Sequence, residues 1–381
     1  MRRTSSPLAG AERDPFTPDS LELAARLAGL PVRIEQVTVT TGGVPAAGYP
    51  DGPRPTGVVR LEGEGRGGHG ECVAWTKAEQ ERFAAFGRGA ALPARGRVAE
   101  FVSALRTATA DAYQRAALEA AVLDLALRQA GTNLFELSGV APRPVRFAVS
   151  FDSSGDPLPV LQSFLETSPG ARIKLDIEPD WTDQTLEGLA ALESVVVLDL
   201  KLRGDLRTAE RVHAAMPNAL VEDPRLDERP RARSGEEPPP VRRAYAAGAT
   251  PAEIVGAAAG RASAGLRARA SFDGPILSAG DVTALPLVPA AINVKPARMG
   301  GFFEALRAIA ACRGAGISTY VGGMFEVGPG RSQVQVLASL FSPEAWNDVA
   351  PIPIALDASR LSSTLVVPAD FIGLGFDAGR Y

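Results

Sequence analysis

The N-terminal part of the chain combines β-like runs with one clearly amphipathic stretch. Residues 115–130 (RAALEAAVLDLALRQA) carry apolar side chains at helical spacing, and Gly131 follows as a typical helix end. A loop rich in glycine and proline is predicted at residues 41–55. Strands are predicted on both sides of this loop, at residues 31–40 (PVRIEQVTVT), 56–65 (TGVVRLEGEG) and 69–75 (HGECVAW). Strands followed by segregated helices indicate an α+β unit that ends near Gly139.

Beyond this unit the pattern changes to a regular alternation. Short runs rich in β-branched residues are separated mostly by stretches of helical spacing, and they occupy residues 145–151, 171–177, 194–201, 218–224, 266–272, 290–296 and 316–323. The alternation predicts parallel strands joined by helical crossovers, and at this length a closed barrel is the natural arrangement. An eighth strand is expected near residues 350–356 (APIPIAL).

Three parts follow from these patterns. They are an N-terminal extension at residues 1–30 with a short helix over residues 21–30, an α+β unit at residues 31–140, and a β/α barrel at residues 141–361. The interval between Pro224 and Leu266 is too long for a single crossover, and residues 225–249 are interpreted as an exposed insertion. Thr250 and Glu253 then have the spacing of a capping box that begins a new helix.

Composition and charge narrow the class of protein. The 381 residues include 40 basic and 44 acidic side chains, for a net charge of −4, so the chain lacks the overall positive field of a nucleic-acid or membrane-surface binder. With 45% hydrophobic and 22% charged residues it is expected to be globular. The 2 cysteines cannot form a disulfide framework, and no apolar run is long enough for a membrane span. We therefore expect a cytoplasmic protein that binds neither nucleic acid nor a membrane.

Lysine is scarce among the basic residues. Only Lys77, Lys174, Lys201 and Lys295 are lysines, and arginine supplies the rest of the 40. One interpretation is that arginine has replaced lysine wherever a surface charge suffices. The other is that the retained lysines transfer protons, because a buried lysine can be tuned to titrate near neutral pH whereas arginine stays charged.

Charged residues gather at the carboxyl ends of the predicted barrel strands, where barrel enzymes carry their active sites. In strand order these are Arg172 and Lys174, Asp199 and Lys201, Glu222, Asp273, and Lys295. Buried charges need partners or a metal, and carboxylates from three successive strands suit an all-oxygen Mg²⁺ site. Alternatively, the three carboxylates are ion-pair partners of barrel arginines.

The order of short motifs adds a family resemblance that covers the chain from about Pro31 onward. The motifs are RIKLD, VVLDLK, LVEDP, SFDGPI, INVKPARMGG and GGMFEVGPGR. Together they resemble the enolase superfamily on its muconate-lactonizing side, which includes o-succinylbenzoate synthases, N-acylamino acid racemases and dipeptide epimerases. The resemblance implies a modified (β/α)8 TIM barrel with an α+β capping domain at residues 31–140 plus about 362–381.

The resemblance also implies a mechanism. One Mg²⁺ would be held by Asp199, Glu222 and Asp273, and it would stabilise the enediolate formed when the proton α to a carboxylate is removed. Lys174 and Lys295 would stand on opposite faces of the substrate as acid and base. Both would need a lowered pKa, from burial and nearby cations; for Lys174 the nearby cation would be Arg172. The outcome would be racemisation, epimerisation or syn β-elimination.

The roles of the remaining candidate site residues follow less directly from the motifs. Arg172 is expected to contact the substrate, and Glu326 is expected either to contact it or to shape its own loop. Lys201 is expected to be catalytic, to bind a substrate anion or to pair with Asp199. Asp223 is expected to point away from the barrel mouth. Selectivity would come from the loop at residues 41–55 together with the neighbourhood of Lys77, and a homo-oligomer is the family expectation.

Two rival functions remain open. An acid-sugar dehydratase is disfavoured because the later strands lack a histidine base. A non-catalytic metabolite-binding or scaffold descendant is motivated by Arg172, Lys201 and the insertion. A dinucleotide site is not expected, because Gly63, Gly65 and Gly68 fit G-x-G-x-x-G but no helix follows them.

Overall fold

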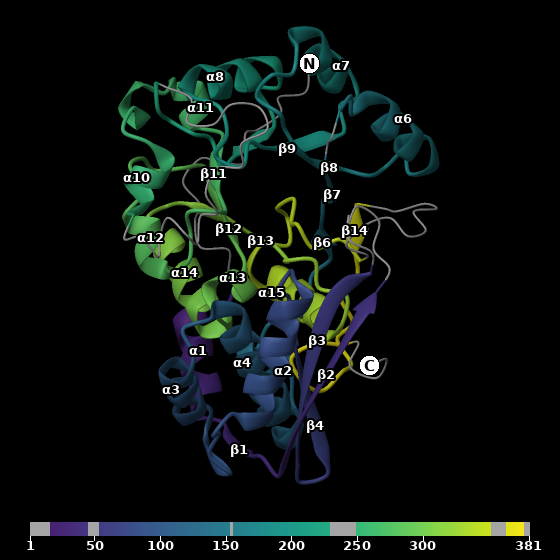
Figure 1. Ribbon diagram of the computed structural model, residues 1–381, viewed down its shortest axis with the longest axis vertical. Helices are drawn as coiled ribbons and strands as arrows, with labels where there is room; N and C mark the ends of the chain where they lie inside the picture. The colour runs from purple at the N-terminus through teal and green to yellow at the C-terminus, as the bar shows by residue number, and fades with distance from the viewer. Residues whose placement is uncertain (1–15, 45–52, 153–154, 229–248, 352–362, 377–381) are drawn as a thin grey trace.

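The larger of the two domains is built on a curled sheet of seven parallel strands (Figure 1). The computed structural model describes residues 16–44, 53–152, 155–228, 249–351 and 363–376. Neighbouring strands are consecutive in sequence, in the order β7 (Val149–Phe151), β8 (Ile173–Asp176), β9 (Val195–Asp199), β10 (Leu220–Glu222), β11 (Ala270–Phe272), β12 (Ala291–Val294) and β13 (Ser318–Val321). Each strand lies within one of the predicted runs, so the predicted parallel βα pattern is confirmed.

Helices alternate with these strands. They include α6 (Leu158–Thr167), α7 (Asp183–Ala191), α8 (Leu206–Ala215), α10 (Pro251–Val255), α11 (Ala264–Arg267), α12 (Ala279–Thr283), α13 (Pro296–Met299), α14 (Phe302–Gly314) and α15 (Pro329–Phe341). The predicted capping box is confirmed, because Thr250 and Glu253 cap α10 reciprocally. Most of the predicted insertion, from residue 229 to residue 248, lies outside the described residues.

The eighth position of the barrel is occupied by a single pair of residues. Asn347 bridges to Phe147, and Asp348 bridges to Gly322 at the end of β13, both in parallel. These two bridges connect the last strand of the sheet to the segment before the first. These bridges stand a few residues before the eighth strand expected at residues 350–356. Most of that expected strand, residues 352–356, lies outside the described residues.

The N-terminal domain is an antiparallel sheet covered by helices. Its strands are β2 (Gln36–Val44), β3 (Arg54–Gly63) and β4 (Arg66–Cys72), with a small pair of β1 (Pro31–Arg33) and β5 (Arg95–Arg97), and its helices are α2 (Lys77–Gly89), α3 (Val98–Ala108), α4 (Ala112–Ala130) and α5 (Leu134–Ser138). The strands extend into the loop predicted at residues 41–55, since Gly42 pairs with Thr56 and Gly43 with Pro55. Glycine there indicated a loop, but it also fits the end of a two-stranded hairpin.

The glycine-rich stretch between β3 and β4 is a tight hairpin. Glu64 and Gly65 form the turn with φ of 53° and 69°, the left-handed region that such hairpins require. Along β4, a Cβ added to Gly70 would lie 1.9 Å from the carbonyl oxygen of Ala117 in α4, so only glycine allows this close packing. The glycines of this stretch therefore form a hairpin turn and allow β4 to pack closely against α4.

Buried carboxylates of the N-terminal domain dock it onto the barrel. Glu71 on β4 accepts hydrogen bonds from the backbone N–H groups of Val327, Gly328 and Gly330 at the start of α15, at 2.8, 2.8 and 3.1 Å. Glu119 on α4 accepts from the N–H of Phe303 in the first turn of α14, at 3.0 Å. The domain therefore contacts the barrel at two places, the start of α14 and the loop that follows β13.

Both ends of the described chain pack against these domains. The helix predicted at residues 21–30 is confirmed as α1 (Ser20–Gly29), with Asp19 as its N-cap and Leu23 and Leu27 buried. Near the other end, β14 (Thr364–Leu365) pairs with β6 (Val145–Arg146). Within the described ranges, none of the helices has both the length and the apolar character needed to cross a lipid bilayer.

Candidate active site and metal centre

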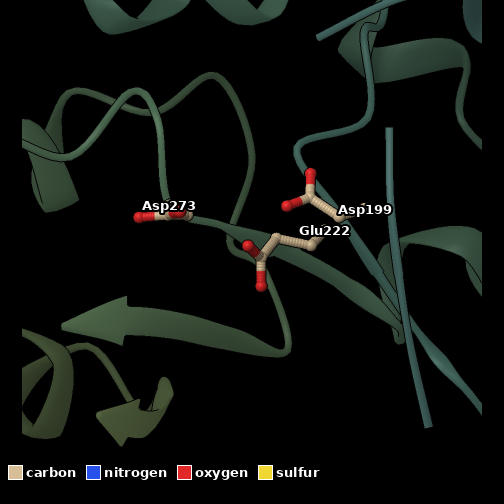
Figure 2. Close-up of side chains that lie close together, drawn as sticks. All are labelled: Asp199, Glu222 and Asp273. Carbon is tan, nitrogen blue, oxygen red and sulfur yellow. The ribbon is translucent and has the colours of Figure 1, made fainter. Parts of the chain in front are cut away.

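Three carboxylates converge at the carboxyl ends of neighbouring barrel strands (Figure 2). Asp199 and Glu222 are the last residues of β9 and β10, where they are paired in register, and Asp273 directly follows β11. One oxygen of each carboxylate lies within 4.8 Å of the others, and all three side chains are buried. The strand order thus brings together the three residues that the sequence indicated as metal ligands.

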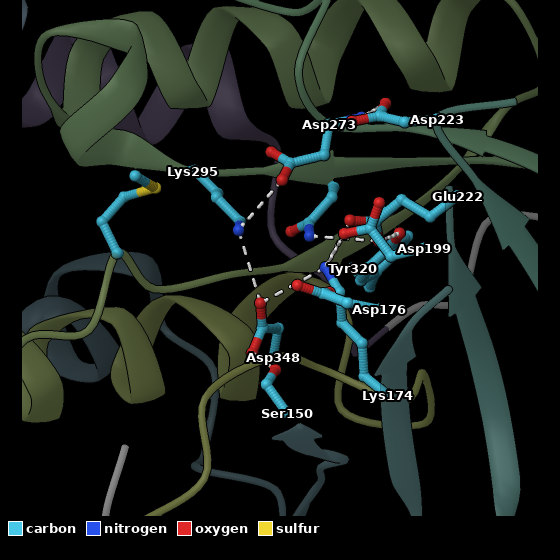
Figure 3. A network of polar contacts seen from close by, with 12 residues as sticks. Ser150, Lys174, Asp176, Asp199, Glu222, Asp223, Asp273, Lys295, Tyr320 and Asp348 are labelled. Carbon is cyan, nitrogen blue, oxygen red and sulfur yellow. Dashed lines mark hydrogen bonds and ion pairs between the residues drawn. The ribbon is translucent and has the colours of Figure 1, made fainter. Parts of the chain in front are cut away.

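Two lysines reach this cluster from strands on either side (Figure 3). Lys174 on β8 forms an ion pair with Glu222 and lies 3.3 Å from Asp199. Lys295, which follows β12, lies 3.0 Å from Asp273. The carboxylate of Asp348 lies between them, 3.6 Å from the ammonium of Lys174 and 3.4 Å from that of Lys295. The two lysines are thereby held at a short distance from one another and from the cluster.

The predicted lowering of the pKa of Lys174 is wrong for the metal-free chain. Burial alone lowers the pKa of this ammonium, but the carboxylates of Glu222, Asp199 and Asp348 outweigh burial and raise the pKa well above its ordinary value. The expected depression by Arg172 has no contact to support it. The guanidinium of Arg172 donates to the carbonyl of Ala171 and lies 5.8 Å from the ring of Trp346.

Lys201 stands at a tight turn just after β9. Its ammonium lies 2.7 Å from Asp199 and 3.1 Å from Asp176, and its backbone N–H donates to Asp199 at 2.9 Å. Its side chain is 39% exposed, in contrast to 3% for Lys174 and 7% for Lys295. Of the three roles expected for Lys201, pairing with Asp199 is the one for which the structure provides contacts.

Glu326 lies in the loop after β13 and faces its own loop. One carboxylate oxygen accepts from the N–H of Met324 at 2.8 Å, and the other lies 3.6 Å from the guanidinium of Arg331. These contacts do not include the carboxylate cluster. Its expected substrate contact therefore stays a prediction, as does that of Arg172.

Asp223 supports the site from behind. Its carboxylate accepts from the backbone N–H groups of Asp273 and Gly274, at 2.8 and 2.9 Å, and so fixes the turn that presents Asp273. Its φ of 48° lies in the left-handed region and turns the chain sharply after Glu222. As expected, the side chain does not join the cluster.

Several residues of the site were missed by sequence reasoning. The Tyr320 hydroxyl donates to Glu222, and the guanidinium of Arg298 lies 2.6 Å from Asp273. Arg298 stands three residues after Lys295 in the motif KPAR, and Tyr320 lies in a predicted strand, so both carried a weak signal. Asp348 carried none, because it is held by an isolated β-bridge to Gly322 and belongs to no strand that could show a pattern.

The donor set fits a divalent cation. All three candidate ligands are carboxylates, the oxygen donors that Mg²⁺ prefers. Oδ2 of Asp199 is completely buried and faces two ammonium groups, those of Lys201 at 2.7 Å and Lys174 at 3.3 Å, so a cation already lies where a metal ion would bind. Burial raises the pKa of Glu222 to about 8, and the neighbouring carboxylates Asp199 and Asp273 contribute to this increase. The repulsion between the carboxylates of such a cluster falls when a cation binds them.

One cavity lies beside the site and a second lies on the N-terminal domain. A small one of about 10 Å³ beside Asp348 is lined by Ser150, Gly323, Phe325, Arg331 and Ala350 as well. A hollow of about 580 Å³ lies on the N-terminal domain, between the β2–β3 hairpin and the start of α2, and is lined by Thr41, Gly42, Gly43, Pro53, Pro55, Thr76, Lys77, Gln80 and Glu81. Trp75, next to Thr76, packs edge-on against Phe325 with ring centroids 5.4 Å apart. The hollow therefore lies close to the barrel loop that carries Glu326.

Two family models match the chain. A model described as the C-terminal domain of a domain of unknown function (DUF8230) matches residues 141–238 and 254–354. The corresponding N-terminal domain model matches residues 25–137.

Curated relatives and solved structures match as well. The N-succinylamino acid racemase of an Amycolatopsis species is 31% identical over 240 residues, which are 59% of this chain and 57% of the racemase. The N-succinylamino acid racemase of Thermus thermophilus is 29% identical over 229 residues, which are 59% of this chain and 56% of that protein. The chain thus spans little more than half the length of these relatives.

The structural matches extend over nearly the whole chain. A dipeptide epimerase from Methylococcus capsulatus, solved with Mg and the dipeptide L-Arg-D-Lys, matches 90% of this chain and 99% of its own, with a TM-score of 0.68 and 19% identity. The muconate lactonizing enzyme from Pseudomonas putida matches 91% of this chain and 98% of its own, with a TM-score of 0.66 and 20% identity. At such identities the shared feature is the fold, a barrel with an additional N-terminal domain.

Proposed function

We propose that this chain, which belongs to the DUF8230 family and is a divergent member of the enolase superfamily, removes the proton α to a carboxylate of a small substrate and delivers another proton to the opposite face of the same carbon. The observation that carries the proposal is the pair of buried lysines, Lys174 and Lys295, at the two sides of one carboxylate cluster. Proton transfer by two groups on different sides inverts the carbon, so the reaction is a racemisation or an epimerisation.

The metal-binding part of the proposal assigns Asp199, Glu222 and Asp273 as ligands of Mg²⁺. A bound Mg²⁺ supplies electrostatic stabilisation of the charge that develops on the substrate carboxylate as the proton leaves. Tyr320 and Arg298 orient Glu222 and Asp273 through the contacts described above. Asp348 keeps the two ammonium groups in place between their strands.

The proton-transfer part assigns Lys174 and Lys295 as the two acid–base groups. Neutralising the carboxylates around Lys174 removes the charge that raises its pKa, so that burial then favours the neutral amine. Neither lysine side chain is more than 7% exposed, which excludes water from the proton that is transferred. Syn β-elimination would use the same first step, but the relatives named racemase and epimerase favour delivery of a proton to the same carbon.

The substrate class follows from the same relatives. We propose an amino acid whose nitrogen is acylated, either by a small acid or by a second amino acid in a dipeptide. The hollow of about 580 Å³ next to Lys77 provides room for the part of the substrate that differs between these classes. It includes residues of the hairpin region from which selectivity is expected.

A direct test is conversion of single enantiomers. The full-length chain is stripped of metal, and N-succinyl amino acids and L,L-dipeptides are offered with and without Mg²⁺, with chiral chromatography as the readout. The expected result is interconversion of the two configurations that requires Mg²⁺ and stops when a chelator is added. Lack of interconversion for every member of both classes, with Mg²⁺ bound, would contradict the proposal.

A further inference from the structure

Lys201 differs from the other two lysines of the barrel mouth in how it is held. It follows Asp199 by two residues, and both it and Leu202 have left-handed backbones, with φ of 50° and 60°. This turn folds the side chain back over the end of β9, so that one residue contacts both oxygens of Asp199. The backbone N–H donates to Oδ1, and the ammonium lies 2.7 Å from Oδ2.

A second carboxylate stands next to this contact. Asp176 at the end of β8 is the register partner of Asp199, so the two like charges lie side by side on adjacent strands. The ammonium of Lys201 lies between them, 3.1 Å from Asp176. Lys201 therefore neutralises a repulsion that the two strand ends would otherwise have.

The position of this ammonium conflicts with a metal ion on Asp199. A divalent cation and an ammonium that share one buried carboxylate oxygen repel each other strongly, because little water screens them. Lys174, also close to Asp199, is almost fully buried and has little room to move. Lys201 is 39% exposed and already in contact with Asp176, so it can leave Asp199 at little cost.

We propose that Lys201 is a built-in competitor of the metal: its ammonium occupies Asp199 in the metal-free chain and moves to Asp176 when a divalent cation binds. This inference rests on the metal site of the proposed function and assigns Lys201 a positioning role. Metal binding then exchanges one cation for another on Asp199, and this exchange weakens the affinity for Mg²⁺. Because Lys201 already neutralises Asp199 in the metal-free chain, folding does not require the metal.

Calorimetric titration of Mg²⁺ into the metal-stripped full chain tests this directly. Lys201→Met removes the ammonium with little change in length, and we expect its Kd for Mg²⁺ to fall at least tenfold. Lys201→Arg keeps the positive charge and is expected to bind as weakly as the parent chain. Arg60→Met is the matched control, since Arg60 is a half-exposed cation paired with Glu62 on β3, and its Kd should not change.

The proposed movement of the Lys201 ammonium to Asp176 is tested by a double-mutant cycle. Asp176→Asn removes the place to which the ammonium moves, so it should raise the Kd for Mg²⁺ about tenfold in the parent chain and leave it nearly unchanged beside Lys201→Met. Circular dichroism of every variant without metal monitors folding, and Lys201→Gln replaces Lys201→Met if the latter is unfolded.

The outcomes separate this inference from the proposed function. Equal or weaker Mg²⁺ binding by Lys201→Met than by the parent chain overturns the competition but leaves the metal site intact. An Asp176→Asn effect that persists beside Lys201→Met overturns the movement to Asp176. If neither the parent chain nor Lys201→Met binds Mg²⁺ at millimolar concentration, both the inference and the metal site are wrong.

Discussion

The barrel mouth and the contact between the two domains both bury carboxylates, but they satisfy them differently. At the domain contact, Glu71 accepts three backbone N–H groups and Glu119 accepts one at a helix start. At the mouth, Glu222 and Asp273 contact side chains instead: ammonium, guanidinium and phenol groups. Backbone donors are fixed, whereas the ends of long side chains can move.

This difference distinguishes a structural carboxylate from a functional one. A carboxylate such as Glu71, which accepts several backbone N–H groups and has no ammonium among its partners in the described residues, already has its donors in place and contributes to folding. Asp199 accepts one backbone N–H but also contacts two ammonium groups. A carboxylate surrounded by lysines retains negative charge that a cation or a substrate can use, and its counter-ions can be displaced. The types of partner therefore tell more about function than burial does, since both sets of carboxylates are buried.

The largest contrast is expected for metal binding. Glu222→Gln keeps the size of the side chain but removes a charged ligand, and we expect the affinity for Mg²⁺ to fall by more than about 100-fold. Glu71→Gln, the matched change at the domain contact, should leave the affinity unchanged. Titration calorimetry of both variants measures this, and equal effects would remove the distinction between the two regions.

Stability should show the opposite order. Glu71→Ala leaves three backbone N–H groups at the start of α15 without their acceptor, and we expect the free energy of unfolding to fall by about 3 kcal/mol. Denaturant titration of the metal-free chain measures this change. Loss of Mg²⁺ binding by a variant that is still folded would show that Glu71 also shapes the mouth, and the two regions would then not be separate in function.

A smaller effect is expected in the pH dependence of stability. Burial raises the pKa of Glu119 to about 7 from an ordinary value of 4.5. A carboxyl with a raised pKa stabilises the fold below its unfolded pKa, and this contribution is lost as the pH rises through 7. Between pH 5 and pH 8, the free energy of unfolding of Glu119→Gln should therefore fall by roughly 2 kcal/mol less than that of the parent chain. Parallel pH profiles in denaturant titrations would contradict this pKa.

Much of the site could be predicted because its residues stand at regular places. Asp199, Glu222, Asp273 and Lys295 end or follow strands with clear β-branched patterns, and parallel strands bring such ends together. The pattern cannot show how many carboxylates face one lysine, so the direction of the pKa shift of Lys174 was wrong. Asp348 escaped notice because two backbone bridges, rather than a strand, place it between the lysines.

The sequence predicted the main elements of the fold but not their exact ends. The seven strands and the long helix α4 follow from hydrophobic periodicity, which is a local property of the sequence. The exact strand ends and the closing pair Asn347–Asp348 depend on contacts between distant segments, which periodicity does not encode. For the same reason the glycines at the end of β2 indicated a loop, and periodicity gave no sign that Gly70, inside a predicted strand, is required by its close packing against α4.

The central claim, that Lys174 and Lys295 transfer the α-proton, is tested most directly by isotope exchange. Each enantiomer of a substrate found in the enantiomer assay is incubated in D₂O with Mg²⁺ and the parent chain, Lys174→Met, Lys295→Met or Arg60→Met, and proton NMR follows the α-hydrogen. We predict that both lysine variants lose racemisation by at least about 1000-fold while Arg60→Met exchanges like the parent chain. Exchange and racemisation that survive in both Lys174→Met and Lys295→Met at the parent rate would contradict the account.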